Sequence, residues 1–260
     1  MKVLILGTAT QAEARAARIV ADAVQANPDT VLGLATGGTM LPLYAELRRI
    51  HAAEGLSFAK VKTFNLDEYV GLSPGHPASY HHYMREVLFD HIDIDLDRVF
   101  LPLGDAADPN EEAEAYEARI EQAGGIDLQL LGIGRNGHIG FNEPTSSLGS
   151  KTRIKTLTES TREANRPYFA EGEAMPKYAL TMGIGSILAA RKCLLVATGA
   201  AKATAVAQMI EGPVSAACPA SALQLHAKAT IVLDQEAASD LKLSSYYQQV
   251  HPAGAKSEFE

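Results

Sequence analysis

The chain has 260 residues, and 47% of them are hydrophobic, which is enough for one sizeable α/β domain with a buried core. Its formal net charge of −8 disfavours a broad nucleic-acid or anionic-membrane surface, because both need a basic face. The two cysteines, Cys193 and Cys218, suit a reducing compartment better than a secreted disulfide scaffold. No apolar run approaches transmembrane length. We therefore expect a cytoplasmic protein that binds neither nucleic acid nor membranes.

Short apolar segments alternate with segments of helical periodicity along the chain. The expected strands are 2–6, 31–35, 61–66, 98–103, 126–134, 153–157, 177–182, 192–198 and 229–234. The expected helices are 11–25, 40–52, 79–91, 110–124 and 200–212. This alternation predicts one α/β domain over residues 1–250, with a Rossmann-like, doubly wound, mostly parallel sheet and helices on both faces. Residues 251–260 are expected to form a loose polar tail.

The turn between the second strand and the second helix reads Thr36-Gly37-Gly38-Thr39. Glycines let a backbone approach an anion, and the free N–H groups and dipole at a helix start favour phosphate. A plain tight turn in which Thr39 caps the helix explains the same residues, because strand–Gly–helix turns are common. A Walker A loop is excluded, since no Gly-Lys-Ser/Thr follows.

The stretch "FNLDEYVGL" (64–72) places two carboxylates, Asp67 and Glu68, just after the third strand. Ligands of open parallel sheets bind beyond such strand ends, so Asp67 is a candidate general base. Taken alone, such a pair is more often a solvated loop carboxylate that caps the next turn.

The loop "GIGRNGHIGFNEP" (132–144) begins like the dinucleotide fingerprint G-x-G-x-x-G. That fingerprint needs a helix at its last glycine, but Gly140 and Pro144 follow and disfavour one. A dinucleotide site is therefore not expected here, and the polar residues of the loop need another explanation.

Asn136, His138 and Glu143 share this loop at the carboxyl end of a strand. A carboxylate can orient and charge-stabilise an imidazole, which can then move a proton near neutral pH. A single His or Glu is usually structural or solvated, but the three together predict a catalytic group.

Four further histidines, His76, His81, His82 and His91, cluster in sequence. They lack an H-E-x-x-H pattern, and the adjacent pair would point to different faces of a helix, so we expect no metal site. Lys202 lies past a strand and near a helix start, where it would suit a second phosphate contact unless it is an ordinary surface lysine.

Together these stretches resemble the glucosamine-6-phosphate deaminase family. The resemblance runs in order through "LGLATGGT", "FNLDEYVGL", "GIGRNGHIGFNEPTSSL", "SKTRIKTLT", "KYALTMGIGSIL" and "ASALQLH", and so spans nearly the whole chain. It implies that D-glucosamine 6-phosphate and water give D-fructose 6-phosphate and ammonia in amino-sugar catabolism, by isomerisation coupled to deamination. It implies no metal or organic cofactor.

The resemblance also implies roles for individual residues. Asp67 is implied as the base that takes the C2 proton and returns it at C1. His138 is implied to open the pyranose ring, supported by Glu143 and residue 136. Some family members have Asp at position 136, whereas this chain has Asn, which can orient His138 but cannot accept a proton as a carboxylate does.

The implied phosphate-binding residues are Gly37, Gly38, Thr39 and Lys202. The family also uses an arginine in this site. In "TREANRPYF" Pro167 stands near its usual position, so Arg166, one residue away, is the expected substitute.

Regulated family members form hexamers and bind N-acetylglucosamine 6-phosphate between subunits, through a serine, an arginine and a lysine. This chain has Ser146, Arg153 and Lys155 at the matching positions, so a homo-oligomer with this activator is one expectation. Residues two apart on a strand share a face, so Arg153 and Lys155 would point the same way whether or not they bind a ligand. The alternative is therefore an ordinary strand whose basic side chains are solvated.

Three other functions stay open. The family is similar in fold to 6-phosphogluconolactonases, and a deaminase for another amino sugar phosphate would keep the same scaffold. A non-enzymatic sugar-phosphate sensor is the third. Such regulators carry a helix-turn-helix segment beside the sensor, and none is visible before the strand at 2–6.

Overall fold

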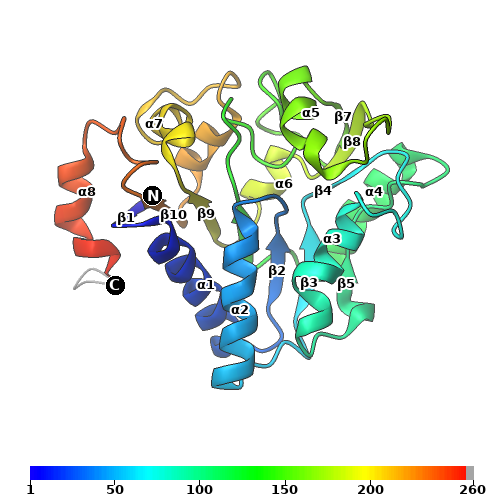
Figure 1. The fold of residues 1–260 in the computed structure, drawn as a ribbon, viewed down its shortest axis with the longest axis horizontal. Helices are drawn as coiled ribbons and strands as arrows, with labels where there is room; N and C mark the ends of the chain where they lie inside the picture. Colours follow the sequence, from blue (N-terminus) through cyan, green and yellow to red (C-terminus); the bar gives the residue numbers. More distant parts are fainter. Residues whose placement is uncertain (256–260) are drawn as a thin grey trace.

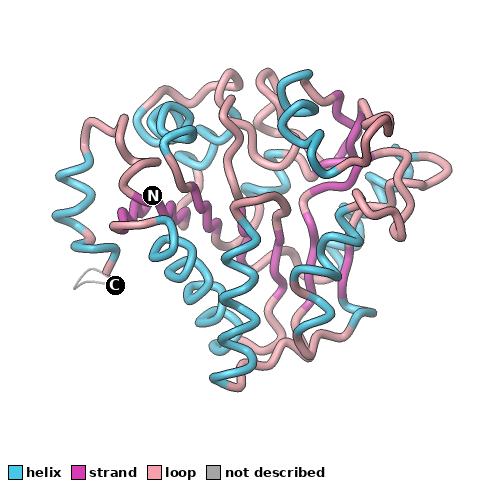
Figure 2. The backbone as a smooth tube through the Cα atoms, viewed as in Figure 1, coloured by secondary structure: helices cyan, strands magenta, loops and turns pink. Residues whose placement is uncertain are grey.

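A computed structural model describes residues 1–255, in which strands and helices alternate (Figures 1 and 2). The strands are β1 (Lys2–Leu6), β2 (Val31–Leu34), β3 (Lys62–Asn65), β4 (Asp67–Tyr69), β5 (Val99–Phe100), β6 (Leu128–Leu131), β7 (Arg153–Thr156), β8 (Tyr178–Thr181), β9 (Cys193–Ala197) and β10 (Ala229–Asp234). The α-helices are α1 (Ala9–Ala26), α2 (Met40–Glu54), α3 (Tyr80–Val87), α4 (Pro109–Gln122), α5 (Glu159–Asn165), α6 (Ile184–Leu188), α7 (Ala203–Glu211) and α8 (Ser244–Val250).

Seven strands form one sheet in the order β1-β10-β9-β6-β2-β3-β5, and every neighbouring pair in it is parallel. This confirms the predicted α/β class. The chain runs outward from β2 through β3 to β5, and outward in the other direction from β6 through β9 to β10. The direction of winding therefore reverses between β2 and β6, where open α/β sheets bind their ligands beyond the strand ends.

The helices cover both faces of this sheet. In Figure 1, α1, α2 and α3 lie in front of it, and α4 and α6 lie behind. The Thr8 hydroxyl caps α1 by accepting a hydrogen bond from the Gln11 N–H at 3.2 Å. Small alanines on the buried side of α1 let it approach the sheet and α2 closely. Within residues 1–255, no helix is both long and apolar enough to span a membrane.

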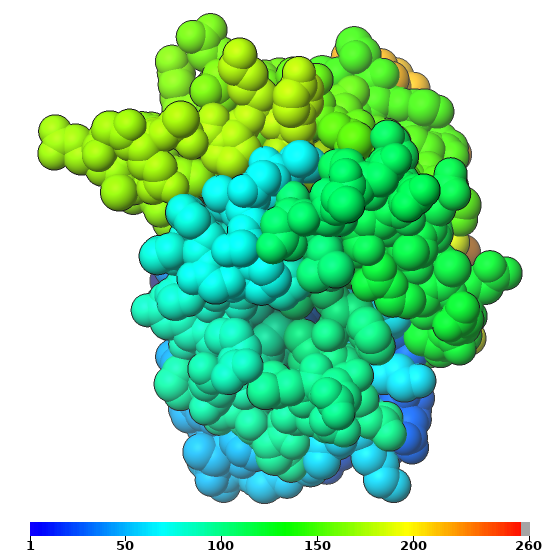
Figure 3. All heavy atoms as spheres, turned by 90° about the vertical axis from the view of Figure 1, so that its right-hand side faces the viewer, coloured from blue at the N-terminus to red at the C-terminus, as the bar shows by residue number. Residues whose placement is uncertain are grey.

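A second, three-stranded antiparallel sheet, β4-β8-β7, was not predicted. The segments 153–157 and 177–182 were expected in the main sheet. They pair instead with each other and with the three-residue β4, over a separate apolar cluster that includes Tyr69 and Phe141. β7 is only half-buried, as suits the edge of a small sheet, whereas β6 and β9 of the main sheet are buried throughout. In Figure 3 a yellow-green part of the chain projects beyond the surface below it.

The first residues of the expected tail, 251–255, are packed against the domain and are not loose. His251 and Gly254 are buried, and the Arg15 side chain donates to the Gly254 carbonyl at 3.3 Å. The turn Pro252–Gly254 packs against β1, so the packed chain continues past residue 250. Residues 256–260 of the expected tail lie outside the described part.

Candidate active site

A cavity of about 550 Å³ opens at the carboxyl ends of β2, β3, β6 and β9. The segments that follow these strands contribute residues 36–39, Asp67, residues 132–136, 138, 140 and 141, and Lys202 to its lining. The α5 segment supplies a further wall, including Thr161 and Asn165. The cavity thus lies beside the point where the sheet winding reverses, and it brings together residues as far apart in the chain as Ala35 and Lys202.

Asp67 lies where the chain passes from one sheet to the other. The Leu66 N–H donates to the Leu34 carbonyl of the main sheet, and Asp67 then pairs with Thr181 in the small one. Only 4% of Asp67 is exposed. Burial first, and then the charge of Glu68, raise the pKa of Asp67 to about 8, although the N–H of Phe141 opposes the shift.

Glu68 is fully buried and caps α3. Its carboxylate accepts hydrogen bonds from the N–H groups of Tyr69, Tyr80 and His81, at 2.8–3.1 Å, and lies 3.0 Å from His81 Nδ1. The alternative that Asp67 and Glu68 are solvated loop carboxylates is therefore wrong. A buried acid with a raised pKa in a cavity marks a candidate proton-transfer group.

The loop after β6 brings its three predicted residues into contact. The Asn136 side chain donates to Glu143 Oε2 at 2.8 Å and accepts the His138 N–H at 3.2 Å. His138 Nδ1 lies 3.5 Å from Glu143 Oε2, an ion-pair contact rather than a hydrogen bond. A Cβ at Gly134 would lie 2.3 Å from the imidazole, so only glycine leaves room for this ring.

Glu143 is buried, with 2% exposed, and it is held as a carboxylate. Burial opposes ionisation, but contacts with His138, Thr161 and Asn136 outweigh it and lower the pKa of Glu143 to about 2. The Thr158 hydroxyl donates to its other oxygen at 3.1 Å. Asp67 and Glu143 thus have pKa values displaced in opposite directions within one site, which is the pattern expected of groups with separate proton-transfer roles.

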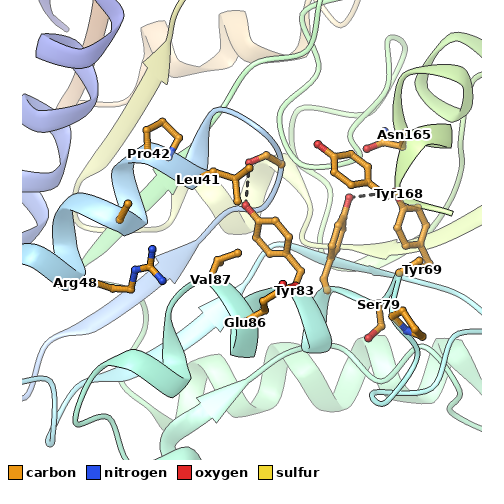
Figure 4. A pocket seen from close by; sticks show the side chains of 15 residues that line it. Leu41, Pro42, Arg48, Tyr69, Ser79, Tyr83, Glu86, Val87, Asn165 and Tyr168 are labelled. Carbon is orange, nitrogen blue, oxygen red and sulfur yellow. Dashed lines mark hydrogen bonds between the residues drawn. The ribbon is translucent and has the colours of Figure 1, made fainter.

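The glycine-rich turn after β2 forms the far end of the cavity. Gly37 has φ +103°, a left-handed conformation that glycine adopts without strain. Thr39 precedes α2, but its side chain makes no capping hydrogen bond. The alternative explanation, in which the Thr39 hydroxyl caps this helix, is therefore wrong. The Tyr83 hydroxyl donates to the Gly37 carbonyl at 3.0 Å and holds the turn against α3 (Figure 4).

Lys202 reaches the cavity, whereas Arg166 does not. Lys202 Nζ donates to the Ile133 carbonyl at 2.7 Å, and burial, followed by the charge of Arg135, lowers its pKa. The Arg166 guanidinium donates instead to the carbonyl of Glu173, and Arg166 is absent from the cavity lining. The geometry therefore gives no support to the expected phosphate contact of Arg166. Arg135, which was not predicted as a site residue, lines the cavity.

A neighbouring pocket of about 620 Å³ lies between α2 and α3 (Figure 4). It is lined chiefly by apolar and aromatic side chains such as Leu41, Val87 and Tyr83. Tyr80 and Tyr168 line both this pocket and the cavity, so they form part of the wall between them. None of the predicted catalytic residues lines the neighbouring pocket, whereas Asp67, Asn136 and His138 line the cavity.

Two of the three predicted regulatory residues, Arg153 and Lys155, lie on the edge strand β7. Arg153 and Lys155 share one face of it, as expected. Arg153 Nη1 donates to the side chain of the buried Asn142 at 2.8 Å, and burial lowers its pKa. Ser146 is buried, and its hydroxyl has no partner among residues 1–255. Arg153 is thus part of the support of the catalytic loop.

The clustered histidines make separate contacts. His76 pairs with Glu173 at 2.9 Å, and His81 with Glu68. Among the residues that the structure describes, no three His, Cys, Asp or Glu side chains are grouped to hold a metal ion.

Comparison with known proteins decides the family. Residues 7–232 match the family model of glucosamine-6-phosphate isomerases/6-phosphogluconolactonase. The chain belongs to this family. Among its curated members, the glucosamine-6-phosphate deaminase of Shewanella loihica is 52% identical, covering 96% of this chain and 93% of that protein. That of a Marinomonas species is 55% identical, with 95% and 94% covered.

Solved structures of the family divide into a near and a distant group. A structure described as a monomeric glucosamine-6-phosphate deaminase matches with a TM-score of 0.90 and 50% identity, covering 92% of this chain and 100% of that one. The 6-phosphogluconolactonase of Trypanosoma brucei matches with a TM-score of 0.74 but 21% identity, covering 92% and 98%. The lactonase likeness shows a shared fold alone.

Proposed function

We propose that the protein converts D-glucosamine 6-phosphate and water to D-fructose 6-phosphate and ammonia. One observation carries the proposal: a buried carboxyl group of raised pKa shares a cavity with a glycine-rich helix start and with an imidazole that contacts a carboxylate outside the lining. The near relatives named as glucosamine-6-phosphate deaminases support it.

The first step assigned to the cavity is ring opening. The ring-closed sugar has no carbonyl, so its C2 hydrogen is not acidic until the C1 hydroxyl proton leaves and the ring oxygen gains one. His138 is placed to move that proton, because Glu143 fixes one side of its ring and stabilises the imidazolium. Asn136 holds Glu143 and the His138 backbone, so its role is to orient the pair.

The second step moves hydrogen from C2 to C1. In the open-chain aldehyde, a base removes the C2 proton and leaves an enolamine. Return of the proton at C1 places a C=N bond at C2, and water then replaces the nitrogen and releases ammonia. One carboxylate above both carbons can perform both transfers, and we assign this role to Asp67, the buried acid of the cavity.

The phosphate anchors the substrate away from the reacting carbons. The α2 N-terminus at Gly37, Gly38 and Thr39 offers backbone N–H groups and a favourable dipole, and Lys202 adds a cation. Binding energy gained there positions C1 and C2 near Asp67 and His138.

A coupled assay tests the function directly. Purified protein is given glucosamine 6-phosphate, and ammonia and fructose 6-phosphate are measured together. We expect equal amounts of both products. Hydrolysis of 6-phosphogluconolactone without ammonia release would identify a lactonase, and binding without turnover would identify a sensor.

Regulation and assembly stay predictions. A homo-oligomer activated by N-acetylglucosamine 6-phosphate would use the exposed side of β7, whereas a relative of 50% identity is described as monomeric. Lys155 tests this better than Arg153, because Arg153 also holds Asn142. In a regulated oligomer, Lys155→Ala should abolish a response to the acetylated sugar and leave basal turnover unchanged. The reducing cytoplasm is the compartment we propose, since both cysteines are unpaired.

A further inference from the structure

The phosphate end of the cavity requires more positive charge than Lys202 alone supplies. A phosphate monoester carries about −1.5 to −2 charges at pH 7. The acidic residues in the lining are Asp67 and Glu163, and one Lys202 N–H is already donated to the Ile133 carbonyl. Glu163 repels an anion, so a single lysine leaves the phosphate incompletely neutralised.

Arg135 is the second strongly basic side chain in the cavity lining. It follows Ile133, the residue whose carbonyl binds Lys202, by two positions, so its backbone lies beside the lysine. It is exposed, and its positive charge contributes to the lowered pKa of Lys202. Two cations held close together without an anion repel each other, and a bound phosphate would relieve that repulsion.

We propose that Arg135, from the catalytic loop itself, is the arginine that binds the substrate phosphate together with Lys202 and the α2 N-terminus. Arginine presents paired donors that match phosphate oxygens. Because Arg135 precedes Asn136 and lies three positions before His138, phosphate binding there also fixes the loop that carries the ring-opening group. This inference rests on the proposed function for the identity of the sugar.

The alternative source of the arginine is Arg166, which makes a matched control. Arg166 is also exposed, and its substitution removes the same charge, but its guanidinium binds the Glu173 carbonyl outside the cavity lining. We expect Arg135→Gln to raise KM for glucosamine 6-phosphate roughly tenfold or more, with a smaller change in kcat. Arg135→Lys should recover part of the loss, and Arg166→Gln should leave KM near the wild-type value.

Inorganic phosphate separates anion binding from turnover. Its Kd, measured by calorimetry, should rise in Arg135→Gln by a factor similar to that in KM and stay unchanged in Arg166→Gln. If the wild type fails to release ammonia, the proposed function fails, while the calorimetric comparison still decides the role of Arg135. The proposal would be overturned if Arg135→Gln bound inorganic phosphate with the Kd of the wild type. It would also be overturned if phosphate binding weakened only in Arg166→Gln.

Discussion

Where we propose that the reaction occurs, Asp67 in the cavity lining and Glu143 beside His138 are almost fully buried, and their pKa values are displaced to about 8 and about 2. Where we propose that the phosphate binds, Gly38 and Arg135 are exposed. Proton transfer needs an acid or base held at a fixed position and in one protonation state. A phosphate, by contrast, can be bound by several different arrangements of N–H donors and positive charges. Substitutions at the reacting end should therefore change kcat and its pH dependence, and those at the phosphate end should chiefly change KM.

The strongest test of the reacting end is Asp67→Asn. Removal of a general base lowers kcat by roughly 10²- to 10⁴-fold. The pKa of Asp67 is raised in the folded state, so the wild type loses stability as pH rises from about 4 to about 8. The variant lacks this loss and should unfold at a higher temperature than the wild type above pH 8, with no difference near pH 3. Thermal unfolding at both pH values checks this, and equal stability at high pH would contradict the burial argument.

The next effect concerns the imidazole pair. His138→Gln should lower turnover of the ring-closed sugar about 100-fold while affecting an open-chain analogue much less. Glu143→Gln should cause part of the same loss, and the double variant should be no worse than His138→Gln, because both residues act in one step. Steady-state kinetics on both substrates decides this, and equal losses on the two substrates would remove the ring-opening role.

A smaller effect is expected at Arg153, which supports the catalytic loop from β7. Arg153→Ala leaves the buried side-chain oxygen of Asn142 without its donor and should destabilise the fold by about 1–3 kcal/mol. The matched control is Lys155→Ala on the same strand face, for which we expect less than about 0.5 kcal/mol. Denaturant unfolding of both variants tests the contrast. Equal stability of the two would show that Arg153 is an ordinary surface charge.

The smallest expected effect tests whether the charge of Glu68 contributes to the raised pKa of Asp67. Glu68→Gln keeps one of the two oxygens that accept N–H groups at α3, replaces the other with an NH2 group, and removes the charge that helps to raise the pKa of Asp67. The acidic limb of kcat/KM should therefore move below its wild-type position near pH 8. Titration of the substrate amine is common to both proteins and cancels in the difference. A limb that stays in place would leave burial as the sole cause of the shift.

The sequence predicted most of the main sheet because its strands are continuous apolar runs between amphipathic helices. It did not predict the small sheet, since β4 has three residues and follows β3 after Leu66 alone. Nothing local distinguishes such a strand from a loop, because its pairing with β8 joins residues over 100 positions apart.

Motif residues were likewise easier to predict than their surroundings. Asn136, His138 and Glu143 meet as expected, because one short loop carries them. The burial of Asp67 comes from packing against distant segments, and so does its raised pKa. Arg135 is the one arginine or lysine within the loop 132–144, but nothing local in the sequence distinguishes a side chain that lines a cavity from an ordinary surface arginine.

The most direct measurement of the central assignment is exchange of the C2 hydrogen of glucosamine 6-phosphate with solvent deuterium, followed by NMR. If Asp67 is the base, the wild type should exchange this hydrogen at a rate that rises as pH approaches 8, and Asp67→Asn should show no exchange above the enzyme-free rate. Folded Asp67→Asn protein that still exchanges the C2 hydrogen at the wild-type rate would contradict the assignment.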